Sequence, residues 1–201
     1  MIKQSKISII VPIHDMTNGD KFLWRLVNSL MSQTYKNYEL IITKDGKMAE
    51  NTNSGIKKAR GEWIKILYLD DYFTHDMVLD NLLIEVKSGK KRRNVDWVIC
   101  GTNNNLNPFW TDDILSGNNK LGSPSALLFR NDFEDNLLFD ENMSWLLDCD
   151  YFQRMKDRFG YPLILQGNYI TLGEHSGQMT NILTNEQKLK EHELINQKYA
   201  K

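Results

Sequence analysis

The amino-acid sequence predicts an α/β fold in which helices flank a Rossmann-like, mostly parallel central sheet. First, apolar runs typical of strands alternate with amphipathic helical segments over the first half of the chain. Second, the first strand-like run is continuously apolar, which is typical of a strand buried on both faces of a parallel sheet. Third, 201 residues with 41% hydrophobic and 25% charged residues suffice for one globular domain with a full core.

The first half shows the alternation most clearly. Its first segment is a β-branched run closed by Pro12, and its second segment places apolar side chains on one helical face. Thr74 is expected to cap the third helix. The pattern predicts strands over residues 7–13, 38–43 and 63–69, which alternate with helices over residues 23–31, 50–60 and 78–86. Such alternation is typical of a parallel sheet with right-handed crossovers.

The second half is less regular and is predicted to form a smaller region. Residues 102–122 are rich in Asn, Gly and Asp and are expected to be a long surface loop. The capping-box spacing of residues 184–187 predicts the start of a polar helix. The remaining elements are expected as strands over residues 95–100, 125–129, 163–165 and 169–171 and a helix over 147–159. We expect one domain over residues 1–201, with halves at about 6–101 and 102–180 and a C-terminal helix at 184–200.

The bulk composition excludes several classes of protein. A net charge of −1 gives no general attraction to nucleic acid, so no nucleic-acid partner is expected. No apolar run approaches the roughly 20 residues of a membrane span and no signal peptide is visible, so we expect a cytoplasmic protein without a transmembrane segment. Cys100 and Cys149 lack metal-binding spacing; reduced thiols are expected, with a single disulfide as the alternative.

One dense basic cluster lies at residues 87–93. It suits contact with a lipid-diphosphate acceptor or an anionic bilayer surface, which would bring the protein into peripheral contact with a membrane. A solvated loop between a helix and a strand is the more usual role of such a cluster, and we prefer that interpretation.

Two adjacent carboxylates, Asp70 and Asp71, follow directly on the strand expected over residues 63–69. Neighbouring carboxylates repel each other unless a cation lies between them or water covers them. The carboxyl end of a parallel strand is where α/β proteins bind ligands, and hard oxygen ligands suit Mg²⁺ or Mn²⁺. The pair therefore predicts a metal site that bridges to phosphate, and a polar turn before the next helix is the alternative.

Three further side chains are expected near the same edge of the sheet. Asp45 ends the second strand, Asp148 lies near the start of the helix over 147–159, and His175 follows the last strand. Taken singly, each has an ordinary explanation: a turn residue, a charge favoured by the helix dipole, and a loop residue. Their expected convergence on one edge with Asp70 and Asp71 is what favours a functional site.

The order of these segments resembles a known family. Residues 9–15, 29–35 and 38–46 look like the nucleotide-binding half of family 2 glycosyltransferases of GT-A fold. Residues 59–71 resemble the run into the DXD metal motif of that family, and residues 139–154 resemble its acceptor-side segment. The resemblance covers roughly residues 6–180, and it lies in the shared order and spacing more than in any single motif.

On the donor side, the resemblance implies binding of a nucleotide-diphosphate sugar. The backbone after Pro12, with His14 beside it, would line the nucleotide. Asp45 would accept a hydrogen bond from the base, and Asp70 would contact the ribose. Asp71 would ligate Mn²⁺ or Mg²⁺, which would bridge the diphosphate.

On the acceptor side, the resemblance implies that Asp148 is the general base of an inverting transfer. Asp150 is the rival for that role, and Asp148 is preferred from its place in the matching segment. His175 is placed like a histidine that some relatives use near the metal. The implied acceptor is a hydroxyl group of a glycan, a lipid-linked molecule or a protein.

Several positions depart from the family pattern. Lys44 and Tyr68 stand where the family often has acidic residues, His14 where it often has an aromatic residue, and Leu147 where it usually has Glu. These departures motivate one alternative, a transferase fold that binds ligands without catalysis. A sugar nucleotidyltransferase is a weaker alternative, because residues 15–19 hold one glycine and no basic residue to cradle a triphosphate.

Overall fold

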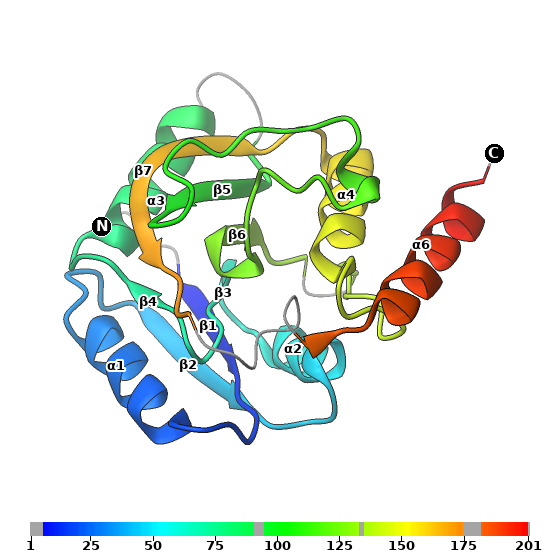
Figure 1. Ribbon diagram of the computed structural model, residues 1–201. Coiled ribbons are helices and arrows are strands. Elements are labelled where there is room, and N and C mark those ends of the chain that lie inside the picture. The colour runs from blue at the N-terminus through cyan, green and yellow to red at the C-terminus, as the bar shows by residue number, and fades with distance from the viewer. Residues whose placement is uncertain (1–5, 91–94, 133–134, 175–181, 201) are drawn as a thin grey trace.

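The computed structural model describes residues 6–90, 95–132, 135–174 and 182–200 (Figure 1). The elements of the first half are β1 (Ile7–Pro12), α1 (Gly19–Met31), β2 (Tyr38–Thr43), α2 (Met48–Lys58), β3 (Trp63–Ile66), β4 (Tyr72–Phe73) and α3 (Val78–Lys90). Those of the second half are β5 (Trp97–Thr102), η1 (Ile114–Ser116), η2 (Pro124–Ala126), β6 (Leu127–Arg130), α4 (Leu147–Phe159), β7 (Leu163–Thr171) and α6 (Asn185–Tyr199). Nearly every predicted element is present within a few residues of its expected bounds.

The strands of the described residues form one sheet of seven in the order β2-β1-β3-β6-β5-β7-β4. Strands β1, β2 and β3 are parallel, and so are β5 and β7. Strand β6 pairs antiparallel with both β3 and β5, and β4 pairs antiparallel with β7. Five strands therefore run in one direction and two in the other, which confirms the predicted α/β class with a mostly parallel central sheet.

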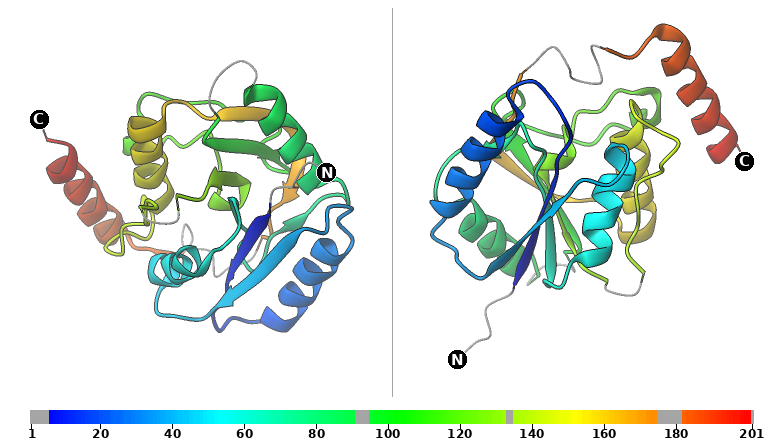
Figure 2. Two further views of the ribbon diagram at one scale, coloured as in Figure 1. Left: turned by 180° about the vertical axis from the view of Figure 1, so that it is seen from behind. Right: turned by 90° about the horizontal axis from the view of Figure 1, so that it is seen from below.

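Helices cover both faces of the sheet. In the view from below, α1 and α3 lie on one face and α2 and α4 on the other (Figure 2). Strands β1, β3 and β5 are buried along their whole lengths, as their continuous apolar sequences predict. Helix α6 stands at the side of the molecule, next to α4 and the segment that leads into it (Figures 1 and 2).

The structure corrects three local predictions. Strand β3 ends at Ile66 rather than residue 69, because the chain turns there, with the amide of Asp71 bonded to the carbonyl of Tyr68 at 2.9 Å. Helix α3 begins at Val78, so Thr74 is not its cap. The Thr74 hydroxyl instead contacts Asn168 and Thr171, which ties β4 to β7. The two short strands expected over residues 163–171 are one strand, β7.

The second half confirms other expectations. The capping box at the start of α6 is formed, with reciprocal hydrogen bonds between Thr184 and Gln187. Cys100 and Cys149 are both buried free thiols, so the disulfide alternative is wrong. Among the described residues, no helix combines the length and the apolar character that crossing a membrane requires. Residues 87–90 of the basic cluster form the end of α3 and residues 91–93 lie outside the described residues, so both of its interpretations stay predictions.

Candidate active site

The turn after β3 carries the two adjacent acids. Asp71 is only 4% exposed, and its Oδ1 accepts a hydrogen bond from the amide of Gly173 at 3.0 Å. Arg25 on α1 donates to the backbone carbonyl of Asp70 at 2.5 Å. A Cβ atom on Gly173 would lie 2.3 Å from that same carbonyl oxygen, so this close approach requires glycine. The turn is thus held between α1 and the segment after β7.

Burial and like charge both act on Asp71. Burial raises the pKa of Asp71 to about 7, with Asp70 adding to the shift and Ser125, Gly173 and Lys65 opposing it. Lys65 is fully buried, and its Nζ donates to the carbonyls of Ile66 (3.1 Å), Leu127 (3.3 Å) and Ser125. Burial lowers the pKa of this lysine to about 8. In the described part of the chain, no cation forms an ion pair with Asp71.

Asp148 lies in the first turn of α4, as predicted. Its Oδ2 accepts a hydrogen bond from Asn119 Nδ2 at 2.8 Å, and its Oδ1 accepts one from the amide of Cys149 at 2.8 Å. Burial raises the pKa of Asp148, and these neutral donors oppose the rise. A half-buried carboxylate with a raised pKa, oriented by neutral donors, has the properties of a general base.

Asp150 lies two residues further along α4 and has a different environment. Its carboxylate is fully buried and contacts Arg154 at 2.8 Å, Lys198 at 2.9 Å and the Tyr199 hydroxyl at 3.0 Å. Two cations and a hydroxyl occupy its oxygens, so the group is structural. Of the two rivals named from the sequence, Asp150 is therefore paired with cations, whereas Asp148 is bonded to neutral donors.

Tyr68 connects the two halves of the site. Its hydroxyl is buried and makes no hydrogen bond of normal geometry with any described residue. Burial raises the pKa of Tyr68, the nearby carboxylates of Asp148, Asp71 and Asp70 raise it further, and the neighbouring Thr52 side chain opposes the rise without a hydrogen bond of normal geometry. One hydroxyl is therefore within electrostatic reach of acids from both halves. Of the acids expected to meet at one edge of the sheet, Asp70, Asp71 and Asp148 act on this hydroxyl, and Asp45 does not.

A cavity of about 400 Å³ lies where β1 ends and α1 begins. His14, Lys44 and Leu69 are among its lining residues. Lys44 pairs with Asp15 at 2.6 Å on the rim. The cavity occupies the position at which α/β proteins bind nucleotides. Pro12, predicted to precede the nucleotide contacts, is the last residue of β1.

Asp45 does not line this cavity. Its carboxylate contacts the Ser54 hydroxyl at 2.5 Å and Lys58 at 3.4 Å, both on α2. The Ser54 hydrogen bond, with help from Lys58, lowers the pKa of Asp45. A contact between Asp45 and the base of a nucleotide stays a prediction. It requires the Asp45 side chain to leave its partners on α2.

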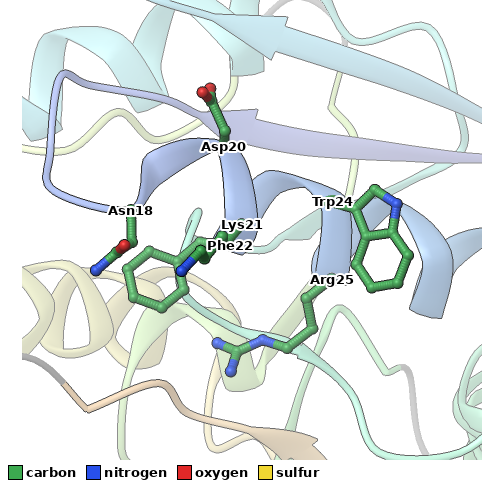
Figure 3. A pocket seen from close by; sticks show the side chains of 6 residues that line it. All are labelled: Asn18, Asp20, Lys21, Phe22, Trp24 and Arg25. Atoms are coloured by element: carbon green, nitrogen blue, oxygen red, sulfur yellow. The ribbon is translucent and has the colours of Figure 1, made fainter.

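A second, more open hollow of about 620 Å³ lies along α1 (Figure 3). Phe22 and Arg25 point to one side of the helix and Asp20 to the other (Figure 3). The Arg25 guanidinium lies 4.4 Å from the centre of the Tyr72 ring and 5.3 Å from that of Phe22. These cation–π contacts hold the arginine against the acidic turn.

The sequence reasoning missed three residues that build the site. Asn119 orients Asp148 and also accepts hydrogen bonds from the amides of residues 121 and 122, an Asx-type turn. Asn51 joins the ends of β1 and β2 by bonding Ile13 and Asp45. The Ser125 hydroxyl accepts a hydrogen bond from the amide of Tyr68 at 2.9 Å. The sequence signal for Asn119 was the asparagine-rich composition of residues 102–122, which predicts a polar loop but does not single out this residue.

The predicted metal ligands can be examined in part. His175 lies outside the described residues, and within the described ranges no group of three or more ligating side chains is found. Mg²⁺ and Mn²⁺ in nucleotide sites commonly take one or two carboxylates and complete their shell with phosphate oxygens and water. The Asp70–Asp71 pair, with a repulsion that raises the pKa of Asp71, fits this donor set.

Comparison with proteins of known sequence gives partial matches. The chain is 30% identical over 70 residues to a Rickettsia conorii protein named as an uncharacterized glycosyltransferase, a match that covers 35% of this chain and 11% of that protein. It is 26% identical over 105 residues to glycosyltransferase GlyA of Streptococcus pneumoniae, covering 39% of this chain and 15% of that protein. The chain thus matches only a small part of the length of these curated relatives. No protein-family model matches.

Solved structures share the fold across nearly the whole chain. Staphylococcus aureus TarS, residues 1–349, in complex with UDP-GlcNAc, matches with a TM-score of 0.66 and 17% identity, covering 94% of this chain and 65% of that one. The mannosyltransferase PcManGT of Pyrobaculum calidifontis, in complex with GDP-Man and Mn²⁺, matches with a TM-score of 0.67 and 14% identity, covering 100% and 66%. The fold is therefore that of GT-A-like glycosyltransferases.

Proposed function

We propose that this chain is a metal-dependent, inverting glycosyltransferase domain that moves a sugar from a nucleotide-diphosphate sugar to an acceptor hydroxyl. The observation that carries the proposal is the position of Tyr68, whose hydroxyl lies within electrostatic reach of Asp71 and Asp148. Transfer needs one acid on the donor side and another on the acceptor side of one site. The similarity to proteins named as glycosyltransferases and the shared fold support the same function.

On the donor side, the proposal gives Asp71 the metal and Asp70 the ribose, with His175 as a further candidate ligand. A divalent ion bound there would supply Lewis-acid neutralisation of the leaving diphosphate. The cavity at the end of β1, lined in part by His14, would receive the nucleotide. Lys44 on its rim supplies a positive charge for an anionic ligand.

On the acceptor side, Asp148 would take the proton from the attacking hydroxyl. The hydrogen bonds from Asn119 and Cys149 fix its carboxylate, and its raised pKa makes it a stronger base than an exposed aspartate. One base and one attack on C1 of the sugar give inversion at that carbon. No second carboxylate nucleophile is needed, unlike in a retaining glycosidase.

The test is Asp148→Asn in the full chain, assayed for transfer from UDP-, GDP- and dTDP-sugars with and without Mn²⁺. We expect transfer to fall by about 10²- to 10⁴-fold, the usual contribution of a general base. Nucleotide binding, measured by calorimetry, should stay within about twofold, since binding energy and base catalysis are separable. Asp157→Asn, an exposed change on the same helix, is the matched control.

Two outcomes would contradict the proposal in different ways. Full activity in Asp148→Asn would show that Asp148 is not the general base. Nucleotide binding by the wild-type chain without transfer from any donor would favour the non-catalytic binding module.

A further inference from the structure

Helix α6 supplies a side chain to the start of the helix that carries Asp148. Glu191 is 7% exposed, and its two carboxylate oxygens accept hydrogen bonds from three consecutive backbone amides. The donors are Ser144 at 2.9 Å, Trp145 at 2.8 Å and Leu146 at 2.8 Å. Successive amides that converge in this way form a concave anion site. Here a carboxylate from 45 to 47 residues downstream fills it.

The start of α4 has no local replacement for this contact. Leu146 occupies the cap position and has no side-chain acceptor, whereas Ser, Thr, Asp or Asn is usual there. The amides at a helix start have no partner within the helix and need an acceptor from elsewhere. Glu191 therefore fixes the backbone of residues 144–146, which ends two residues before Asp148.

Helix α6 is anchored around this contact on both sides. Lys198 pairs with Asp140 at 2.7 Å and with Asp150 at 2.9 Å, and Tyr199 also bonds Asp150. On the N-terminal side of Glu191, the Nζ of Lys188 lies 5.4 Å from the centre of the Trp145 ring, and the His192 ring meets the same ring edge-on, with centres 5.1 Å apart. These contacts hold α6 to the two sides of the turn that begins α4, next to which Figure 1 places it.

We infer that Glu191 is a positioning residue for the general base: by holding residues 144–146, it sets the direction in which Asp148 meets the acceptor. The inference rests on the proposed function. A misplacement of about 1 Å in a reacting group costs up to about 10²-fold in rate, so the start of α4 needs a rigid support. The opposite side of Asp148 is held by Asn119, and together the two contacts fix the carboxylate from separate segments.

The test compares Glu191→Ala and Glu191→Gln with Glu193→Ala, an exposed change on the same helix. We expect Glu191→Ala to lower kcat about 10- to 100-fold with the donor KM within about twofold. Glu191→Gln keeps one acceptor oxygen and should lie between Glu191→Ala and wild type. It also serves as the test if Glu191→Ala does not fold. Glu193→Ala should match wild type.

The pH profile of kcat separates positioning from a loss of folded protein. If Asp148 shifts away from the donors that oppose its raised pKa, the acidic limb of the profile moves to higher pH. A smaller fraction of folded enzyme lowers kcat without moving that limb, and that result would overturn the inference. Wild-type kcat and profile in both variants would also overturn it while the proposed function stands. Absence of transfer by the wild-type chain would overturn the proposed function and this inference with it.

Discussion

The turn after β3 and the start of α4 each bury a carboxylate, but they treat its charge differently. At α4, Asp150 is surrounded by Arg154, Lys198 and the Tyr199 hydroxyl. At the turn, Asp71 has another acid, Asp70, as its neighbour, and the nearby buried lysine is bonded to backbone carbonyls. The charge at α4 is balanced within the chain and therefore stabilises the fold. Among the described residues no cation pairs with the Asp71 carboxylate itself, because Arg25 and Lys65 donate to backbone carbonyls, and this suits a site for an external cation.

The largest effect that tests this comparison is expected from neutralising Asp150, the acid that is paired with cations. Asp150→Asn should lower the free energy of unfolding by about 2 to 4 kcal/mol, because it leaves two cations facing a neutral amide. The value is below that of a fully buried pair because Arg154 and Lys198 are 22% and 33% exposed and regain some hydration. Urea denaturation followed by circular dichroism measures the change.

Asp157→Asn is the matched control for that experiment. Asp157 is exposed on the same helix, and its carboxylate accepts a hydrogen bond from the Gln153 side chain at 2.8 Å. Its substitution should change stability by no more than about 0.5 kcal/mol. Equal, small effects of the two substitutions would show that Asp150 is not a structural acid and would reopen its candidacy as the base.

Neutralising Asp71, which has no ion-pair partner among the described residues, should raise the free energy of unfolding instead of lowering it. The native pKa of Asp71 is about 7 and lies above the ordinary aspartate value of 3.8, so the folded state binds more protons than the unfolded state between these values. Stability from this group is thus present at low pH and is lost as pH rises toward 7. In metal-free buffer with EDTA, Asp71→Asn should be more stable than wild type at pH 8, by an amount on the order of 2 kcal/mol.

The measurement is urea denaturation of both proteins at pH 4.5 and pH 8. The advantage of Asp71→Asn should be small at the lower pH and should grow at the higher pH. Asp70→Asn serves as the control, since it removes the neighbouring charge but keeps the titrating group. A constant difference between wild type and Asp71→Asn at both pH values would contradict the balance of charges argued for the turn.

The two regions also differ in how well the sequence predicted them. Strands β1 and β2 follow from local apolar runs, and their parallel pairing brings Pro12 and Thr43 to one edge. A turn at Asp70 and Asp71 was considered only as the alternative to a metal site. The short strand β4 was not predicted, since only pairing with β7 stabilises a strand of two residues. Asp148 was placed on its helix from the apolar spacing of residues 147–159, and only its role as the base came from the resemblance. Its partner Asn119 is 29 residues away, and periodicity carries no information on such a contact.

The donor residues mark the limit of sequence reasoning. Asp45, Asp70 and His14 were assigned from the resemblance, and of these only His14 lines the cavity at the end of β1. The Asp45 side chain contacts Ser54 on the neighbouring helix. Which partner a flexible side chain takes cannot be predicted from hydropathy or from the order of motifs. Lys44 was treated as a departure from the family pattern, yet it lies on the rim of that cavity.

The smallest expected effect concerns Tyr68, at the junction of the two regions. A buried hydroxyl without a hydrogen bond costs the free energy of its lost hydration, so Tyr68→Phe should raise the free energy of unfolding by about 1 kcal/mol, or Tm by about 2 to 4 °C. The matched control is Tyr151→Phe, which removes a hydroxyl bonded to the Leu137 carbonyl at 3.1 Å and should lower stability by about the same amount. If both substitutions destabilise equally in thermal denaturation, the Tyr68 hydroxyl has a partner in solution.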